Sequence, residues 1–459
     1  MGWSEIQTPI RTTPAQVGLS RCQYYLMCLN WMTAALVACW PLCASDQAPS
    51  DVHLIIGVTK AVPTYRLGER IILKMSFSTP NPGRYKLQRN GEPRDIWDYI
   101  PEVFSVSPSD GATDPHVALS RELGLPIGGS TLMGNDRFRP DPTILQTDLN
   151  EWVRFVKPGV YRISARSSRV SLGSEPGSSL SPRHPLTLDS NEIQVSLLPA
   201  ESKWAANELD DITKSLDSTA STDDEKSIAA ARLRYLNTKS SVVKLIRELP
   251  ETTDEPCHWE LVEGLIESSW RKEAIALLRQ SLNWPEERVS WDAVDLLTKL
   301  TLLERYQYRK LDYEAGSPEQ VKTLQAAIKE RRDRYPLVRD RYTAELKASL
   351  PTKRGRARRD ALFAVWKDQE SDSREFSAER LALMRHEIVS IASELSPGQQ
   401  SWLISNYWQN LPDHQSLLPL VKRIALSNES SPMTFKTRNL RAAAMQRWCE
   451  MDAEGCRVR

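Results

Sequence analysis

The sequence has almost no net charge and few histidines. Its 459 residues include 60 Lys and Arg against 59 Asp and Glu, for a net charge of +1, with 6 His. A chain without an excess of positive charge produces no overall field that attracts nucleic acid or an anionic surface. We therefore expect no nucleic-acid partner.

The sequence also lacks the short motifs of known reactive sites. It contains no phosphate-binding loop, no G-x-S-x-G nucleophile turn and no CxxC pair of zinc ligands. His386-Glu387 begins like a zinc-binding HExxH helix, but Ser390 stands where the second His is needed. We expect no catalytic residue, no metal and no cofactor, while a site built from residues distant in sequence remains open.

The N-terminal apolar run is short for a membrane span. Tyr24–Ala38 reads YYLMCLNWMTAALVA and follows Arg11 and Arg21. A cationic lead, an apolar core and a small-residue end are typical of a secretory signal, and the run is shorter than the ~20 residues of a spanning helix. We predict a signal peptide or N-terminal membrane anchor over residues 1–44.

Three fates of this segment stay open. Cleavage after Ala44 would release the chain. Leu36-Val37-Ala38-Cys39 resembles the lipobox of bacterial lipoproteins and would make Cys39 the lipidated residue. An uncleaved apolar segment extending to Leu42 would anchor the chain instead. The predicted location is periplasmic or extracellular, with membrane association through the N-terminus as an alternative to release.

Cysteines are few outside this segment. Of 7 cysteines, only Cys257, Cys449 and Cys456 follow residue 44. Cys449 and Cys456 are close enough in sequence to form a disulfide in an oxidising compartment. The alternative is three unrelated thiols, and Cys257 has no partner in either case.

Residues 51–200 have the alternation of strands. Val52, Leu54 and Ile56 occupy every second position near the start, and Ile193, Val195 and Leu197 do so at the end. Lys157-Pro158-Gly159 is a turn signal before a β-rich run. Six to eight short strands over about 150 residues favour a two-sheet β-sandwich.

Three stretches of this region resemble immunoglobulin-like modules of bacterial envelope proteins. They are Tyr65-Arg66-Leu67-Gly68-Glu69, Lys157-Pro158-Gly159-Val160-Tyr161, and Ser190-Asn191 with Ile193. The resemblance implies an immunoglobulin-like sandwich but no recognition site, because the Cys–Trp–Cys pattern of antibody domains is absent.

Residues 203–452 have helical periodicity. Thr222-Asp223-Asp224-Glu225 and Ser396-Pro397-Gly398-Gln399 are capping boxes at predicted helix starts. A helix over Val321–Tyr335 should end before Pro336. Successive amphipathic helices make this region similar to HEAT-type α-solenoids, so the chain resembles exported bacterial proteins that combine an immunoglobulin-like sandwich with a HEAT-like repeat region.

Two stretches of the helical region are candidate interaction surfaces. Tyr407 and Trp408 lie in a polar setting, Asn406-Tyr407-Trp408-Gln409-Asn410, and aromatic residues are enriched at binding sites. Lys353–Arg359 is the densest basic stretch and could hold anionic groups; its arginines are Arg354, Arg356, Arg358 and Arg359.

These patterns favour an exported, non-catalytic interaction or scaffold protein of the cell envelope, with a protein partner. Two alternatives remain open. The aromatic content of the helical region is compatible with a glycan- or peptidoglycan-binding module. An envelope hydrolase with a site assembled from distant residues is the other.

Overall fold

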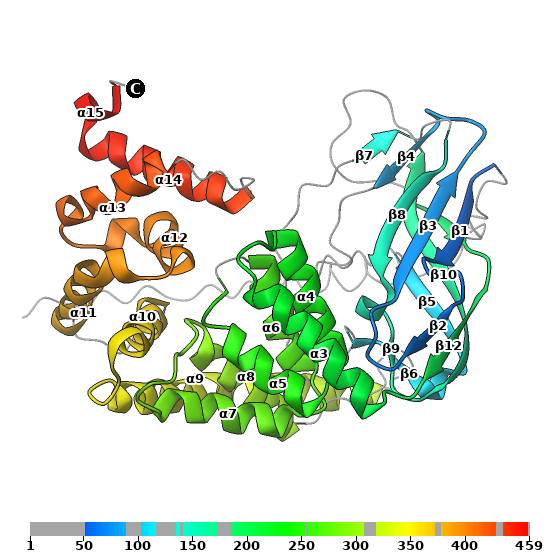
Figure 1. Ribbon diagram of the computed structural model, residues 1–459, viewed down its shortest axis with the longest axis horizontal. Helices are drawn as coiled ribbons and strands as arrows, with labels where there is room; N and C mark the ends of the chain where they lie inside the picture. The colour runs from blue at the N-terminus through cyan, green and yellow to red at the C-terminus, as the bar shows by residue number, and fades with distance from the viewer. Residues whose placement is uncertain are drawn as a thin grey trace, which may run out of the picture. The chain divides into compact units, whose positions relative to one another are not determined.

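The computed structural model describes residues 51–88, 102–115, 135–137, 141–172, 185–252, 255–306, 318–371, 378–427 and 435–457. Strands come first, from His53 to Leu198, and helices follow from Ser202 to Arg457 (Figure 1). Residues 51–459 form one compact unit. The predicted change from strands to helices near residue 200 is confirmed. Below, residues 51–198 are called the strand-rich part and residues 202–457 the helical part.

The strands form two larger sheets and one short pair. A three-stranded antiparallel sheet has the order β1 (His53–Val58), β3 (Ile72–Ser78), β8 (Thr143–Asp148). A seven-stranded sheet contains β2 (Thr64–Arg66), β12 (Ile193–Leu198), β10 (Gly159–Leu172), β4 (Tyr85–Gln88) and β7 (Asn135–Arg137), with β5 (Glu102–Ser107) and β11 (Pro185–Asp189) also paired to β10. β6 (Ala112–Thr113) pairs with β9 (Arg154–Phe155), and 3-10 turns occupy η1 (Ser109–Gly111) and η2 (Leu149–Glu151).

Strand β10 is the centre of the larger sheet. It begins directly after Lys157-Pro158, as predicted, and pairs with β4, β5, β11 and β12. Tyr161, Ile163 and Ala165 are buried on one face of it, because side chains of a strand point alternately to its two faces. The predicted alternation is also confirmed in β1 and β12, where Leu54, Ile56, Val195 and Leu197 are buried.

The helices follow one another with short connections in the described ranges. Their bounds are α3 (Ser202–Asp217), α4 (Asp223–Leu236), α5 (Lys239–Glu248), α6 (Glu255–Glu267), α7 (Arg271–Asn283), α8 (Ala293–Tyr306), α9 (Pro318–Ser349), α10 (Gly355–Ser371), α11 (Ala378–Ile391), α12 (Pro397–Asn406), α13 (His414–Leu426), α14 (Phe435–Met451) and α15 (Ala453–Arg457), with 3-10 turns η4 (Ala392–Glu394) and η5 (Trp408–Asn410).

Side-chain caps explain three of the helix starts. Thr222 and Glu225 form the predicted capping box of α4, and Ser396 and Gln399 form that of α12. Thr238 and Ser241 form a similar reciprocal cap on α5 that the sequence pattern did not reveal. Each cap satisfies amide groups that the first helical turn leaves without an intrahelical partner.

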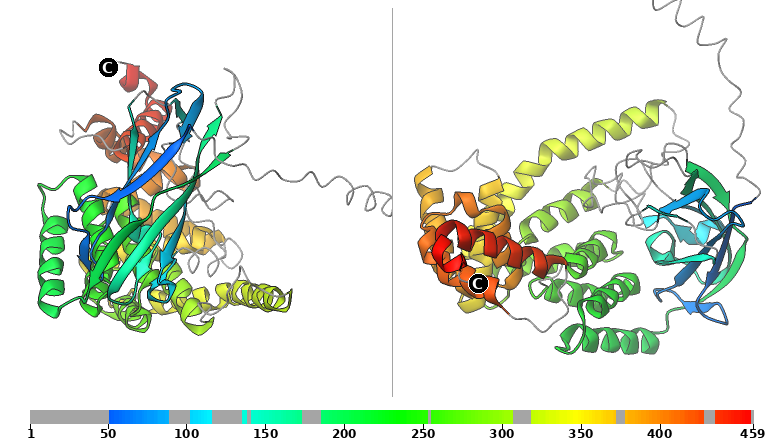
Figure 2. Two further views of the ribbon diagram at one scale, coloured as in Figure 1. Left: turned by 90° about the vertical axis from the view of Figure 1, so that its right-hand side faces the viewer. Right: turned by 90° about the horizontal axis from the view of Figure 1, so that it is seen from above.

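The predicted end of a helix before Pro336 is wrong. Helix α9 continues through this proline to Ser349 and is drawn as one long helix in Figure 2. A proline inside a helix costs roughly 3 kcal/mol, so contacts outside the helix must offset that cost. Tyr335 donates to Asp295, and Arg339 Nε donates to Asp368 Oδ1 at 2.5 Å, so α9 is held on both sides of the proline.

The helical part has two hydrophobic cores that share helix α10. The first core gathers buried residues from α3 to α10, and the second gathers residues from α10 to α14. Ala361, Ala364 and Val365 face the first core, whereas Leu362, Phe363 and Trp366 face the second. Residues 361–366 of α10 are all apolar and buried, as expected of a helical stretch that is covered on all sides, which places this stretch between the two cores.

Candidate functional site: two buried polar joints

The most densely charged buried site surrounds Arg234 of α4. Its side chain is only 1% exposed and contacts four carboxylates. Nη1 lies 3.1 Å from Glu151, 3.0 Å from Glu260 and 2.6 Å from Glu263, while Nη2 lies 2.6 Å from Glu267. A buried charge is tolerated only where partners and hydrogen bonds replace water, and this guanidinium has both.

Helix α6 supplies three of these carboxylates from one face. Glu260, Glu263 and Glu267 are spaced three and four residues apart, which aligns them along the helix. Gly264 lies between them, where an added Cβ would come within 3.2 Å of Arg234 Cβ and 3.1 Å of a Leu245 methyl. The missing side chain allows α4 to approach α6 closely enough for all three ion pairs.

The strand-rich part supplies the other side of the site. Glu151 lies in η2, and it accepts a hydrogen bond from the Tyr235 hydroxyl as well as the ion pair from Arg234. Arg154 of β9 pairs with Glu267, and Tyr235 also donates to Asp148 at 3.2 Å. We call this cluster the Arg234 joint; it consists of Glu151, Arg154, Arg234, Tyr235, Glu260, Glu263 and Glu267.

The Arg234 joint contains more acidic than basic groups. Burial raises the pKa of Glu260 to about 7 and that of Glu263 to about 8, although Arg234 acts in the opposite direction on both. Burial and the neighbouring Glu151 raise the pKa of the Tyr235 hydroxyl well above its ordinary value. The tyrosine therefore remains a hydrogen-bond donor, and the two glutamates are the groups that can hold protons near neutral pH.

A second polar cluster lies where the two helical cores meet. Lys367 Nζ of α10 lies 3.6 Å from the centre of the Trp291 ring and 4.8 Å from that of Trp402. His258 stacks on Trp291 with ring centres 5.2 Å apart, and its Nε2 lies 2.9 Å from Asp292. We call these five residues the Lys367 joint.

Charges in the Lys367 joint are balanced inside the protein. Burial lowers the pKa of Lys367 to about 8, and Asp292 opposes that shift. Burial alone would raise the pKa of Asp292, but His258, Lys367 and Ser290 together outweigh burial and hold that pKa well below its usual range. His258 stacks on the Trp291 ring and the Lys367 ammonium lies over it, so this partly buried ring is part of the packing and not an open platform.

His258 also connects a hydroxyl to a carboxylate. Thr252 Oγ1 lies 3.1 Å from His258 Nδ1, and Asp292 lies on the other ring nitrogen. Nucleophilic hydrolases use this order of hydroxyl, imidazole and carboxylate. Here, however, Thr252 Oγ1 donates its proton to the Leu249 carbonyl oxygen at 2.9 Å, just after the end of α5. We therefore interpret these three side chains as a structural hydrogen-bond network.

The expectation that Trp408 lies on an exposed face is wrong. Its side chain is 3% exposed and stacks on His414, with ring centres 4.4 Å apart. The polar residues around it in sequence belong to the end of α12 and to η5, whose turn directs the indole into the second helical core. Tyr407 is half-buried and stacks on Trp402 at 4.7 Å, next to the Lys367 joint.

The predicted basic patch is largely paired with acids. Arg356 lies 3.5 Å from Glu251, Arg358 lies 2.7 Å from Glu387, and Arg359 lies 3.0 Å from Glu394. The backbone amide of Arg354 donates to the Pro285 carbonyl oxygen. Anion binding by this patch remains a prediction, and the ion pairs reduce the positive charge that it offers.

The lysine that precedes these arginines is buried. Lys353 is 2% exposed and donates to three backbone carbonyl oxygens, those of Ser281, Trp284 and Glu287, at 2.9 to 3.0 Å. It therefore closes the end of α7 and does not belong to a surface patch.

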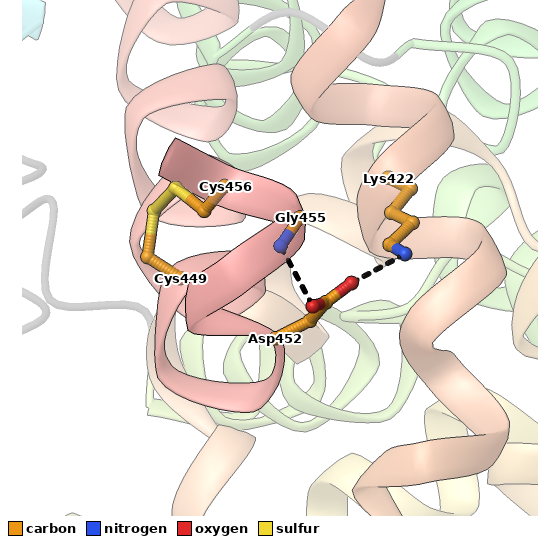
Figure 3. Close-up of a disulfide and its surroundings, with 5 residues drawn as sticks. All are labelled: Lys422, Cys449, Asp452, Gly455 and Cys456. Carbon is orange, nitrogen blue, oxygen red and sulfur yellow. Dashed lines mark hydrogen bonds and ion pairs between the residues drawn. A yellow bond between two sulfur atoms is a disulfide. The ribbon is translucent and has the colours of Figure 1, made fainter. Parts of the chain in front are cut away.

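Cys449 and Cys456 form a disulfide near the C-terminus (Figure 3). It ties the short helix α15 to the end of α14. Asp452, between the two cysteines, accepts from the Gly455 amide at 2.9 Å and pairs with Lys422 of α13 at 2.7 Å. Cys257 is buried and takes no part in a disulfide, and its thiol donates to the Lys226 carbonyl oxygen at 3.8 Å.

The predicted lipidation at Cys39 and cleavage after Ala44 fall outside the described residues. Within the described ranges, no helix combines the length and the apolar character needed to cross a bilayer. Those ranges also contain no cluster of acidic, His and Cys side chains arranged to hold a metal ion.

Neither joint was predicted from the sequence. Arg234 stands within an otherwise ordinary amphipathic pattern, and Glu151 is 83 residues away from it. The glutamates of α6 read as a solvent-facing stripe. A detectable signal was Gly264 inside that stripe, because a glycine in a helix interior often marks a close approach of another element.

Comparisons with known proteins provide no family. No protein-family profile matches the sequence, and no curated protein matches it. A solved structure of E. coli alpha-2-macroglobulin is similar at 10% identity over 86% of this chain and 26% of that chain, with a TM-score of 0.17. The chain thus spans about a quarter of the length of that protein, and so low a TM-score carries no argument about fold or function.

Proposed function

We propose that the protein is an exported, non-catalytic interaction protein of the cell envelope, in which the strand-rich part and the helical part act together as a scaffold for a protein partner. The Arg234 joint is the observation that carries this proposal. Two parts of a chain usually move relative to each other unless their interface is large and apolar. Here, buried ion pairs join η2 and β9 to α4 and α6, and separating a buried pair is costly because it leaves an uncompensated charge.

An immunoglobulin-like sandwich is the proposed class of the strand-rich part. The Tyr161 hydroxyl donates to the Lys157 carbonyl oxygen at 2.8 Å, four residues upstream at the start of β10. Such a return bond from a strand tyrosine to the preceding turn is a hallmark of immunoglobulin-like sandwiches. The antiparallel pairing of β10 with β5, β11 and β12 also supports this class.

A HEAT-like solenoid is the proposed class of the helical part. Helices that are neighbours in sequence also pack on one another, among them α3 on α4, α8 on α9, α10 on α11 and α13 on α14. The two cores follow each other along the chain and share α10. In stacked helical repeats each unit contacts its neighbours, and the stack offers an extended surface for binding.

Export is supported by two features of different kinds. The apolar segment before residue 44 has the organisation of a secretory signal. The Cys449–Cys456 disulfide fits an oxidising compartment, since cytosolic thiols are kept reduced.

Glycan binding is the second candidate function, and exposed tryptophans favour it. Trp259, Trp270 and Trp284 are 46%, 36% and 50% exposed. Exposed aromatic rings can stack on sugar rings. Trp291, in contrast, contacts His258 and Lys367 inside the Lys367 joint.

The test is cross-linked affinity capture of the tagged protein from its native cell envelope, followed by mass spectrometry. A protein partner recovered in stoichiometric amount is the expected result. Arg234→Leu should reduce its recovery, while Arg232→Leu, which removes a peripheral pair with Glu208, should not. Recovery of the protein alone, or with glycan only, contradicts the proposal and advances the second candidate.

A further inference from the structure

Trp284, at the end of α7, differs from the other exposed tryptophans. Its side chain is 50% exposed, and within the described ranges its indole has no aromatic ring contact and its Nε1 makes no hydrogen bond. Trp270 Nε1, in contrast, donates to the Asn237 carbonyl oxygen at 3.2 Å, and the Trp259 ring contacts that of His258 with centres 6.1 Å apart. An indole is an apolar plate with one polar N–H group, and Trp284 offers both to a ligand.

The backbone around Trp284 is fixed by the residues that connect α9 to α10. The buried Lys353 ammonium donates to the carbonyl oxygens of Trp284 and Glu287, at 2.9 and 3.0 Å. The Arg354 amide donates to the Pro285 carbonyl oxygen at 3.3 Å. A site that is rigid before binding loses less conformational freedom when a ligand arrives, so this turn is a suitable place for an exposed ring.

Charged side chains of both signs lie on this turn and on the segment packed against it. Glu286, Glu287 and Arg354 are exposed, and no side-chain hydrogen bond or ion pair joins them to another residue of the described ranges. With the buried Lys353, two acids and two bases leave no net charge here. Unused donors and acceptors in a neutral setting complement a neutral ligand that carries both kinds of group, whereas an acidic or a basic peptide would meet like charges.

We propose that Trp284, Glu286, Glu287 and Arg354 form a binding site for a neutral glycan, with one pyranose ring stacked on the indole; we call it the Trp284 site. A pyranose with equatorial hydroxyl groups has an apolar C–H face and a polar rim. The exposed indole matches the face, the carboxylates accept hydrogen bonds from hydroxyl groups, and the guanidinium donates to them. The Trp284 site rests on glycan binding, the second candidate function, and gives it a location and a sugar class.

Saturation-transfer NMR with the purified full-length protein tests the Trp284 site. The probes are cellotetraose and chitotetraose, with tetragalacturonic acid as the acidic comparison. We expect saturation of the C–H protons of the neutral sugars and a weak affinity, with a Kd on the order of 1 mM, because one ring is stacked. The acidic sugar should bind more weakly than the neutral ones, since Glu286 and Glu287 repel it.

Three variants locate the binding on the surface. Trp284→Ala should weaken the affinity at least about tenfold, because it removes the stacking ring. Arg354→Met, which removes the donor, should weaken it at least about twofold. Trp259→Ala is the matched control, since its indole is 46% exposed, and it should bind as the wild type does. All three positions are exposed, so the variants should fold.

Each contrary result has a different meaning. A Trp284→Ala variant that binds as the wild type does, or equal losses in Trp284→Ala and Trp259→Ala, would overturn the Trp284 site while leaving glycan binding elsewhere open. Preference for tetragalacturonic acid would overturn the neutral sugar class. Absence of binding to both neutral sugars would overturn the site together with the second candidate function. Capture of a protein partner uses no sugar, so the first proposal can fail or succeed independently.

Discussion

Arg234 Nη1 and Glu151 Oε1 lie 3.1 Å apart, although 83 residues separate them in the sequence. The pair joins helix α4 to the 3-10 turn η2 of the strand-rich part. Glu151 also accepts from Tyr235, the next residue of α4, so two consecutive side chains of one helix contact one carboxylate across the boundary. Substitution of Arg234 or Glu151 should therefore destabilise the chain on both sides of that boundary.

Loss of Arg234 should strongly destabilise the protein. Arg234→Leu leaves four buried glutamates with one arginine, and breaking a buried ion pair on one side costs about 3–5 kcal/mol. Arg232 lies two residues before Arg234 in α4 and pairs with Glu208 near the surface, so Arg232→Leu should cost less than about 1 kcal/mol. Urea unfolding at constant pH measures both, and equal losses would contradict the role of Arg234.

Stability should fall as the pH rises through the neutral range. The folded-state pKa of Glu263 is raised to about 8, so the folded protein holds a proton that the unfolded chain has released. Above the unfolded pKa the free energy of unfolding decreases by about 1.4 kcal/mol per pH unit for this group. Unfolding at several pH values should show a shallower slope for Glu263→Gln. Identical slopes in the variant and the wild type would refute the assignment of the proton to Glu263.

Trp408 should behave as a core residue. Trp408→Ala removes a side chain that is 3% exposed, and such truncations cost about 3–5 kcal/mol. Trp284→Ala removes an indole that is 50% exposed and should cost less than about 1 kcal/mol. Thermal unfolding compares them, and a Trp408 variant as stable as the Trp284 variant would restore the surface interpretation.

The disulfide should be present in protein recovered from the envelope. Alkylation after denaturation without reductant should label Cys257 and leave Cys449 and Cys456 unlabelled. Reduction before alkylation should label all three, so that Cys257 serves as the internal control. Labelling of Cys449 and Cys456 without reductant would show that the bond does not form there, which would weaken the case for an oxidising compartment.

Local patterns predicted local structure well. The alternation of Leu54 and Ile56 located β1, Lys157-Pro158-Gly159 located the start of β10, and Thr222 located the start of α4. Each depends on residues within a few positions of one another. The prediction that a helix ends before Pro336 was wrong because Asp295 and Asp368 hold α9 on both sides of the proline. These contacts come from other elements and leave no local sequence pattern.

The joints were not predictable for the same reason. From the sequence alone, Arg234 would be assigned to the solvent-facing side of its helix. Only the fold shows that Glu151 and α6 pack against it. Lys367 likewise reads as the polar face of α10, although Trp291 and Trp402 cover it. The prediction for Trp408 was wrong in the opposite direction. It placed the indole at the surface because of its polar neighbours in sequence, whereas the side chain is buried.

A double-mutant cycle between Arg234 and Glu151 tests the central claim most directly. The cycle compares the unfolding free energies of the wild type, Arg234→Met, Glu151→Gln and the double variant. If the pair connects the strand-rich part to the helices, the two changes should be non-additive, with a coupling of about 1–3 kcal/mol. Additive losses, within about 0.5 kcal/mol, would mean that the two parts are not connected through this joint.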